Sequence, residues 1–360
     1  MRRVVLAAVL AAVGLSVKTG AEDKAVFLQL PTGALASKVS SSGVVIGTLR
    51  EGGGFHWMPT SGMVQIGGTE AASVSRDGRT IAGSALDTRR LEQAAIWQRG
   101  TEWRVLGSVV PNPAPCDALI SSIFGGNGDG TVQVGLAWNG CNFARAFRWE
   151  ESTGMVDLGS TVQGRSSRAD AVSGDGRVVV GWQEAPTGFR QGARWVDGRQ
   201  TLFTRDGGLP VGEANATNGD GSVVVGQVCK FASPEDPFDQ SGWVWTARDG
   251  VQCLEVPRRR LAIEGNFIGL AIATSDDGRV IGGGHSFGLE SESVLWIDRT
   301  PYYLKDYLRS HGVPTAFEGW VNTGFITGMS RDGRVLVGYG AGPRDFTGFV
   351  VVMPSIGDQP

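Results

Sequence analysis

The stretch VSGDGRVVVG, at residues 172–181, decides how this chain of 360 residues folds. An Asp-Gly pair stands between a short polar segment and a run of valines, and a glycine ends the run. Asp-Gly beside β-branched residues is a strong signal for a hairpin, because the glycine accepts the positive φ that a tight turn requires. The stretch therefore predicts a strand, a tight turn and a second strand.

The same pattern occurs seven times along the chain, with VSRDGRTIAG at residues 74–83 as another clear copy. Each copy ends in a closing glycine, which we place at positions 47, 83, 135, 181, 226, 282 and 338. In the first six copies a third strand follows and carries a tryptophan: Trp57, Trp97, Trp149, Trp195, Trp245 and Trp296. A short glycine-bearing turn then leads to a fourth strand. Four antiparallel strands in a repeat of about 48 residues form the blade of a β-propeller.

The repeat predicts an all-β fold, a seven-bladed β-propeller of four-stranded antiparallel blades, with six or eight blades as the alternatives. The seventh copy lacks a fourth strand, whereas residues 25–31 form a spare strand that resembles residues 251–257. We expect this N-terminal strand to complete blade seven and close the ring, because an open ring leaves two sheet edges unpaired. Residues 22–360 are then a single propeller domain.

Composition excludes several other classes of protein. Glycine accounts for 55 residues, about twice the usual share. The glycines do not fall on every third residue, which excludes collagen. Eleven tryptophans and 41% hydrophobic residues exclude a disordered linker, because they supply ample apolar surface to bury. A formal charge of −3 gives no electrostatic reason to expect a nucleic-acid partner.

The first 21 residues are typical of a secretory signal peptide. Arg2 and Arg3 precede an apolar run of about 14 residues, and small residues follow it. A membrane anchor is the alternative, but the run is short for spanning a bilayer. We expect cleavage after Ala21 and no later membrane span, so the mature protein is secreted or periplasmic.

Four cysteines remain after such a cleavage, and in an exported chain an even number favours disulfides. Four cysteines allow three connectivities. The spacings suggest two local bridges, Cys116–Cys141 and Cys229–Cys253.

The repeated sequence segments resemble the HAF repeat, which is found in a family of bacterial extracellular repeat proteins. The closest matches are RAFRW at residues 145–149, GMVDLG at residues 154–159 and AVSGDG at residues 171–176. Residues 304–338 also look like that family's C-terminal end. The resemblance covers about residues 34–354 and implies an extracellular, propeller-like protein. It implies no particular activity.

The connections between strands differ in length on the two faces of the predicted ring. First-to-second and third-to-fourth turns are short and uniform, and they lie on one face. Second-to-third and fourth-to-first connections vary strongly and lie on the other face, which we call the variable face. Binding and catalysis usually reside in variable loops on a rigid scaffold, so we expect the functional site there.

The repeated tryptophans are expected to pack between blades, because their position is the same in each unit. Ligand contacts are instead expected from residues that do not repeat: Trp138, Trp182, Trp243 and Trp320 near the variable face. Lys38 is the only large residue at its position in the inner strands and is a candidate to point into the central channel. The repeated Ser and Asp residues are expected to cap backbone amides in the turns.

Residues 301–311 predict a short helix, with Thr300 as its cap, Pro301 in its first turn and an apolar stripe that packs onto the sheets.

Enzymatic candidates are few. The loop at residues 233–239 gathers Glu235, Asp236 and Asp239 on the variable face, and His285 is expected in an equivalent loop. Paired carboxylates perform glycoside chemistry when they are suitably spaced. No metal-ligand spacing, phosphate loop or nucleophile motif occurs, so no metal or cofactor is expected.

Two functions follow from this pattern. The first is an exported, monomeric module that binds an extracellular glycan or protein through its variable face. The alternative is a secreted carbohydrate-active enzyme, a hydrolase or lyase, that uses acidic residues of the same face.

Overall fold

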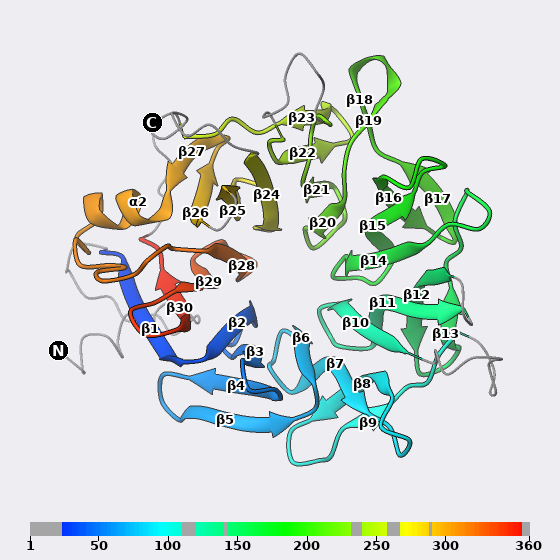
Figure 1. The fold of residues 1–360 in the computed structure, drawn as a ribbon, viewed down its shortest axis with the longest axis horizontal. Coiled ribbons are helices and arrows are strands. Elements are labelled where there is room, and N and C mark those ends of the chain that lie inside the picture. Colours follow the sequence, from blue (N-terminus) through cyan, green and yellow to red (C-terminus); the bar gives the residue numbers. More distant parts are fainter. Residues whose placement is uncertain are drawn as a thin grey trace.

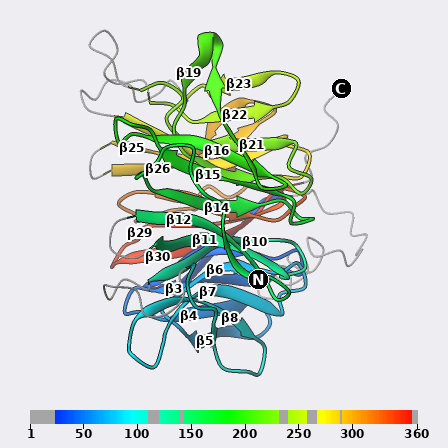
Figure 2. The same cartoon turned by 90° about the vertical axis from the view of Figure 1, so that its right-hand side faces the viewer.

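The computed structural model describes residues 24–109, 120–139, 143–231, 240–257, 267–287 and 290–354. These residues form seven four-stranded antiparallel sheets around a central axis (Figure 1). The sheets stand edge-on to one another in the side view, and the hairpin of β18 and β19 projects beyond their rim (Figure 2). The seven-bladed propeller expected from the repeat is confirmed.

The strands follow one another outward from the axis in the first six blades. They are β2 (Ala34–Val39), β3 (Val45–Leu49), β4 (Gly54–Met58) and β5 (Gly62–Gly67) in blade one; β6 (Glu70–Val74), β7 (Thr80–Leu86), β8 (Glu92–Gln98) and β9 (Arg104–Val105) in blade two; β10 (Ser121–Gly126), β11 (Val132–Asn139), β12 (Phe143–Glu150) and β13 (Gly154–Asp157) in blade three; β14 (Ser167–Val172), β15 (Val178–Glu184), β16 (Arg190–Val196) and β17 (Arg199–Leu202) in blade four; β20 (Ala214–Thr217), β21 (Val223–Gly226), β22 (Trp243–Thr246) and β23 (Gly250–Cys253) in blade five; and β24 (Phe267–Thr274), β25 (Val280–Phe287), β26 (Glu290–Ile297) and β27 (Thr300–Tyr303) in blade six.

Blade seven joins the two ends of the described chain. It contains β28 (Phe325–Met329), β29 (Val335–Ala341) and β30 (Phe346–Val352), with β1 (Val26–Thr32) as its outermost strand. The pairing of β1 with β30 is antiparallel, so that Val26 lies opposite Val352. The expected closure of the ring by the N-terminal strand is confirmed.

The first turn of every blade has the same construction. Five residues separate the first and second strands each time. The turn glycines all have φ between 69° and 80°. In six blades the first turn residue, a serine or asparagine, accepts a hydrogen bond of 2.9–3.0 Å from the amide that starts the second strand. In blade one Ser40 accepts a bond of 2.9 Å from the amide of Val44, one residue before β3. The repeated Ser, Asn and Asp residues therefore act in turn formation, as expected.

A β-bulge interrupts the pairing of the first two strands in every blade. The bulge brings a carbonyl oxygen of the first strand toward the closing glycine of the second. A Cβ on that glycine would lie 1.8–2.2 Å from the oxygen, too close for any side chain. In blade six this contact is made by Gly283, so our assignment of Gly282 as the closing glycine was wrong. Three adjacent glycines, Gly282, Gly283 and Gly284, occur there, and the register of the bulge selects the second.

Each bulge adds one residue to its inner strand, and four of the seven, Ala72, Phe124, Asp170 and Ile272, line the central cavity. The seven residues are Ser37, Ala72, Phe124, Asp170, Asn215, Ile272 and Thr327. Three of them bond to the neighbouring blade: Ser37 Oγ to Ala71 O at 2.7 Å, Asn215 Nδ2 to Ala271 O at 2.9 Å, and Thr327 Oγ1 to Ala36 O at 2.8 Å. The bulge therefore links the blades as well as bending them.

The core lies between the blades. Trp97, Trp149, Trp195 and Trp296 are at most 8% exposed. Each packs against apolar residues of the preceding blade, as Trp195 does against Val132 and Val134. Burial of such large rings is a major source of stability.

The short helix α2 (Leu304–Ser310) begins later than the sequence predicts. Thr300 and Pro301 belong to β27, where Pro301 pairs with Trp296 on the outermost strand of the blade. Proline is tolerated on such an edge strand because its missing amide is not needed there. The helix buries Leu304, Tyr307 and Leu308 in the core, as the apolar stripe predicts.

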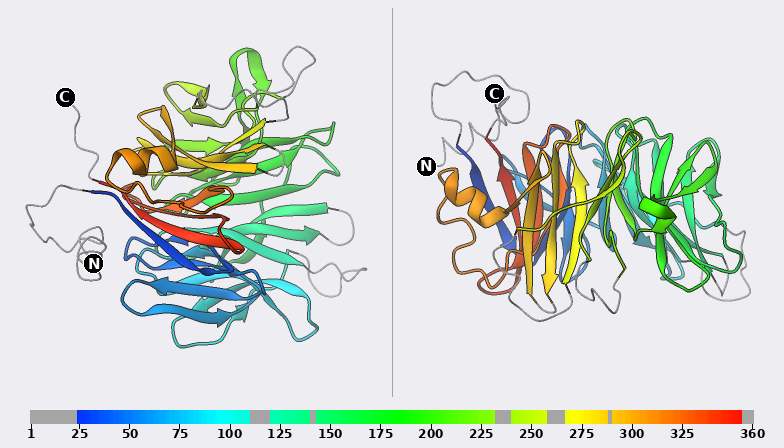
Figure 3. Two further views of the ribbon diagram at one scale, coloured as in Figure 1. Left: turned by 60° about the vertical axis from the view of Figure 1, so that its left-hand side comes forward. Right: turned by 90° about the horizontal axis from the view of Figure 1, so that it is seen from above.

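The unequal connections predicted for the two faces are present. Third-to-fourth turns contain two to five residues, whereas the longer connections all lie at the opposite ends of the strands. These longer connections are residues 106–120, 158–166, 203–213, 227–242, 254–266 and 304–324. The segment 203–213 includes the small hairpin β18 (Thr204–Arg205) and β19 (Leu209–Pro210), joined by η1 (Asp206–Gly208). The helix α2 lies in the last connection, beside the adjacent ends of β1 and β30 (Figure 3).

Ring closure can be tested by truncation. A variant that begins at Gly33 lacks β1 and exposes the edge of β30, together with apolar surface that Leu28 and Leu30 cover. We expect its melting temperature to fall by roughly 10 °C or more, and we expect it to associate through the free edge. Thermal unfolding and size-exclusion chromatography measure both effects. A variant that begins at Lys24 is the control, and equal stability of the two variants would contradict the closure.

Candidate functional site

The inner strands enclose a cavity of about 200 Å³ on the axis of the ring. It extends from the level of the bulges to the Asp-Gly turns, on the face opposite the variable loops. Small residues form much of its wall, including Gly125, Ala171, Ala216, Ala273 and Gly328. The cavity exists because these positions carry almost no side chain.

Five ionisable residues line this cavity: Lys38, Arg76, Asp170, Asp276 and Arg331. Three of them, Arg76, Asp276 and Arg331, occupy the second position of their Asp-Gly turns. That position is serine or glycine in the other four blades. The variation at a single position thus places charge at the mouth of the cavity.

The mouth itself is a ring of backbone hydrogen bonds between neighbouring turns. Arg76 N donates to Gly128 O at 2.8 Å, and Gly174 N donates to Gly219 O at 2.7 Å. The side chain of Arg76 lies across Gly128 and Gly174 and donates to Gly174 O at 3.3 Å. Glycine at these turns leaves room for the guanidinium group, which no larger residue would do.

Lys38 lies deeper, in the wall of the cavity. Its Nζ donates a hydrogen bond to Thr327 O at 3.0 Å. Burial lowers the pKa of Lys38, and the charge of Asp170 partly opposes that effect. No carboxylate lies within ion-pair distance of Lys38 among the residues that the structure describes.

Asp170 ends a chain of alternating charges that runs from the cavity to the variable face. Asp170 Oδ1 lies 2.7 Å from Arg168 Nε, Glu213 Oε2 lies 3.1 Å from Arg168 Nη2, and Glu213 Oε1 lies 2.9 Å from Arg190 Nη1. Burial raises the pKa of Asp170 to about 7, since it outweighs the attraction of Arg168, and Glu213 adds to the rise. Asp170 Oδ2 has no hydrogen-bond partner among the described residues.

The variable face carries an exposed aromatic pair. Phe189 is 65% exposed, and its ring centroid lies 5.6 Å from that of Phe231. The two residues belong to the second-to-third connections of blades four and five. Phe189 precedes Arg190, so the aromatic pair adjoins the outer end of the charge chain.

The structure brings the four candidate tryptophans to different environments. Trp243 is 0% exposed and Trp182 is 3% exposed. Trp243 packs on Phe203, and Trp182 lies beneath Arg190, whose Cζ is 4.3 Å from the ring centroid. Neither ring presents a face to solvent, so the expectation that these two stack on a ligand does not hold. Trp138 and Trp320 are half-buried.

Trp320 belongs to an aromatic cluster with Phe27, Phe317 and Phe349, at centroid distances of 5.1–6.3 Å. Trp138 lies at the end of β11, where its backbone bonds to Ile120 and Ser108. Trp320 lies in the connection 304–324 of the same face.

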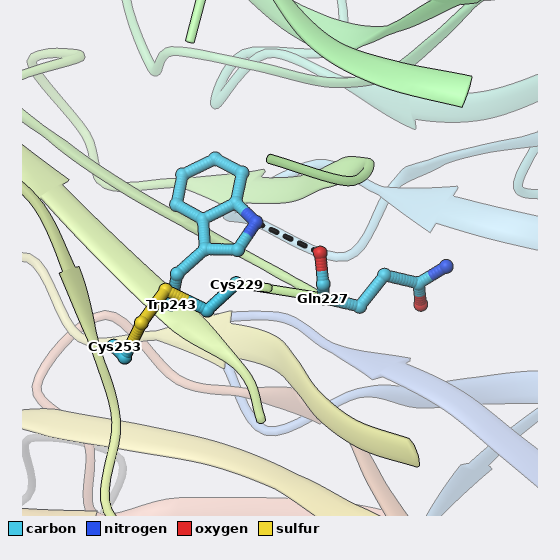
Figure 4. The surroundings of a disulfide bond; sticks show 4 residues. All are labelled: Gln227, Cys229, Trp243 and Cys253. Carbon is cyan, nitrogen blue, oxygen red and sulfur yellow. Dashed lines mark hydrogen bonds between the residues drawn. A yellow bond between two sulfur atoms is a disulfide. The ribbon is translucent and has the colours of Figure 1, made fainter. Parts of the chain in front are cut away.

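The disulfide Cys229–Cys253 is present, as the spacing predicts, with the Cα atoms 5.4 Å apart. It joins the long second-to-third connection of blade five to the outermost strand β23 (Figure 4). Beside it, Trp243 Nε1 donates to Gln227 O at 2.9 Å. The bridge and this bond fix the start of the connection that carries Phe231. Cys116 and Cys141 lie outside the described residues.

The enzymatic candidates do not form a site among the residues that the structure describes. His285 is 1% exposed and lies in β25 beside Trp296 and Tyr303. Burial lowers the pKa of His285 to about 3, which keeps the ring neutral. Glu235, Asp236 and Asp239 lie outside the described residues. The described part of the chain also holds no cluster of His, Cys, Asp or Glu suited to a metal ion.

The sequence analysis did not identify Arg76, Arg331 and Asp276 as site residues. It also missed the series of ion pairs that links Asp170 to Arg190. The signal was available in the turns, because their second position is charged in three copies and is serine or glycine in the other four. Asp170 was harder to find, since the bulge that turns it toward the axis has no separate sequence mark.

Comparison with known proteins supports the fold. No sequence-family model matches the chain, and no curated protein is similar to it in sequence. The β-propeller domain of the trilobed protease from Pyrococcus furiosus has a TM-score of 0.53 at 11% identity, covering 91% of this chain and 95% of that domain. TolB from Acinetobacter baumannii has a TM-score of 0.45 at 12% identity, covering 74% of this chain. The match spans 62% of that TolB chain.

These similarities concern the propeller architecture alone. The protease propeller is described as having an open velcro topology. In the present chain, by contrast, β1 and β30 pair and join the two ends of the ring. Among the described residues, no helix is long and apolar enough to cross a membrane.

Asp170 is expected to make stability depend on pH. Its pKa is about 7 in the folded chain and has an ordinary value of 3.8. Between these values the folded chain retains the proton that the unfolded chain loses. This term therefore lowers the free energy of unfolding as pH rises, by at most about 1.4 kcal/mol per pH unit. We expect Asp170→Asn to gain stability relative to the native chain between about pH 5 and pH 8, measured by urea denaturation.

Asp77→Asn is the control for this experiment. The hydrogen bond from Ser75 holds the pKa of Asp77 below its usual range. Its stabilising contribution is present above the unfolded pKa and is lost as pH falls, which is the opposite dependence. A pH-independent difference between Asp170→Asn and the native chain would contradict the prediction.

The Cys229–Cys253 bridge closes a loop with a sequence separation of 24 residues. Replacing both cysteines with serine is expected to cost about 3 kcal/mol, because the unfolded chain regains the entropy of that loop. Denaturation of the double variant and of the native chain, both without reductant, measures the difference. A loss of less than about 1 kcal/mol in the free energy of unfolding would contradict this prediction, and it would show that the loop is already rigid without the bridge.

Proposed function

We propose that this chain is an exported, non-catalytic binding module that holds a protein or peptide ligand on its variable face. The observation that carries the proposal is the distribution of exposed apolar side chains. Besides Leu209 on the β18–β19 hairpin, six large hydrophobic residues among the described residues of the variable-face connections and strand ends are at least 37% exposed: Leu86, Ile120, Phe189, Ile268, Val321 and Phe346. The Asp-Gly turns hold no such residue in any of the seven blades.

The remaining exposed apolar residues lie on outer strands and on the β18–β19 hairpin. Exposed apolar groups on one face of a rigid scaffold favour contact with another macromolecule. Aromatic residues and arginine are the types most enriched at the centres of protein interfaces, and Phe189, Phe231 and Arg190 lie together on this face.

The scaffold beneath these residues is preorganised. Cys229–Cys253 secures one connection, and Arg190 is held by Glu213 and by the ring of Trp182. Preorganisation reduces the entropy lost on binding. The disulfide also supports an exported protein, since such bonds persist mainly in oxidising compartments. The proposed signal segment, residues 1–21, lies outside the described residues.

The proposal is tested by screening the purified chain against peptide and glycan arrays and measuring the Kd of the best ligand. We expect a peptide ligand, and we expect Phe189→Ser to weaken its binding at least about tenfold, because the exposed ring is lost from the interface. Val156→Ser is the matched control, since Val156 is 46% exposed on the outer strand β13.

Binding that survives Phe189→Ser and Val321→Ser would contradict the proposal. A glycan as the best ligand would contradict the proposed class of ligand but not the proposed binding face. A ligand lost on changing Arg76 instead would move the binding site to the opposite end of the ring.

A further inference from the structure

The central cavity has more cationic groups than it has anions to neutralise them. Lys38, Arg76 and Arg331 line it, together with Asp170 and Asp276. Arg331 forms an ion pair with Asp276 at the mouth. Asp170 is turned toward Arg168, with 2.7 Å between Oδ1 and Nε. Both carboxylates are therefore already engaged by arginines.

Lys38 and Arg76 are left without a carboxylate partner among the described residues. The hydrogen bonds that their side chains make go to backbone carbonyl oxygens, Thr327 O for Lys38 and Gly174 O for Arg76. An ammonium group keeps two further N–H donors after one such bond. Lys38 is half-buried, whereas Arg76 is exposed at the mouth. Because a partly desolvated cation without an anion is costly, an anionic ligand beside Lys38 would relieve that cost.

The cationic groups and the alanines come from different blades. The cationic groups come from blades seven, one and two, as Arg331, Lys38 and Arg76. Blades four to six supply an alanine each, at positions 171, 216 and 273, together with Ile272 and with Asp170 and Asp276, the two carboxylates that Arg168 and Arg331 engage. A ligand that fits both walls has an acid group at one end and a short apolar body at the other.

Size limits the ligand further. The cavity of about 200 Å³ is smaller than the roughly 300–1,000 Å³ of sites that take drug-sized molecules. Its occupant is therefore a small molecule that enters between the Asp-Gly turns.

We propose that the central cavity binds a small monocarboxylate with a short apolar body. Its carboxylate is held by Lys38 after entry past Arg76, and its body lies against the alanines of blades four to six. The inference is independent of the proposed function, because this site lies on the axis and extends to the face opposite the variable loops.

Isothermal titration of the full chain with 3-methylbutanoate tests the proposal. We expect a Kd of about 1 mM or tighter, and at least about fivefold weaker binding of acetate, which lacks the apolar body. Inorganic phosphate is expected to bind more weakly still, because the alanine wall does not suit it. The amine 3-methylbutylamine has the same body and the opposite charge, so it is expected not to bind.

Two variants probe the two ends of the ligand separately. Lys38→Met keeps the length of the side chain and removes its charge, and we expect it to weaken 3-methylbutanoate at least about tenfold. Ala216→Leu fills the cavity without changing any charge and is expected to abolish binding. Lys305→Met, on helix α2, is the control for loss of a lysine elsewhere. Thermal unfolding of each variant confirms that it is folded.

Three outcomes would overturn the proposal. The first is the absence of carboxylate binding by the native chain. The second is 3-methylbutanoate binding that is unchanged in folded Lys38→Met. The third is binding of acetate or phosphate as tightly as 3-methylbutanoate, which would exclude a role for the apolar wall.

Discussion

One steric contact, repeated in each blade, underlies the rest of this ring. A bulge in the innermost strand drives a carbonyl oxygen into the space where a side chain of the second strand would begin. Glycine alone satisfies this contact. The bulge in turn gives each inner strand an extra residue, which lines the central cavity in four blades and bonds to the next blade in the other three. The spacing of blades and the lining of the channel follow from the same feature.

The contact also explains why the two ends of the ring differ. At one end, the bulge and the capped turn hold seven nearly identical backbones close to the axis, and the second turn position differs in charge between them. Arg76, Asp276 and Arg331 occupy that position. At the other end the strands diverge into connections of very different length. Apolar residues are exposed at that end, whereas Arg76, Asp276 and Arg331 place charge at the end formed by the Asp-Gly turns.

The chain of Arg190, Glu213, Arg168 and Asp170 spans these two regions. It fixes Trp182 beneath Arg190, and it holds the carboxylate of Asp170 in an ion pair with Arg168 rather than with Lys38. The same four residues thus stiffen the variable face and leave a cation in the cavity.

Much of the architecture could be predicted from the sequence because it is periodic. Ser173, Asp175 and Gly176 have a local role that is complete within one turn, and six other turns repeat it. The bulge was not predictable in this way, because residues as different as Ala72, Phe124 and Asp170 occupy it. The only sign of the bulge in the sequence is the closing glycine, and in blade six the run from Gly282 to Gly284 left the identity of that glycine ambiguous.

The candidate site was less predictable for the same reason. Lys38 stood out because its counterparts in the other blades are small, whereas the ion-pair chain of Asp170 uses two strands of blade four and the connection to blade five. Trp243 and Trp182 do not repeat, and that suggested ligand contact. Packing on Phe203 and beneath Arg190 shows instead that non-repeating residues also fill irregular parts of the core.

The seam between β1 and β30 has a mechanical consequence. Val26 and Val352 lie opposite one another, so the two ends of the ring leave the same edge of the same blade. Tension applied between the ends of the chain acts on this antiparallel pair at its first bond. The hydrogen bonds of the pair then break one after another from that end, rather than all together under shear. Under load the propeller opens at blade seven first, while the other six blades, each made of consecutive strands, carry no force until the seam has parted.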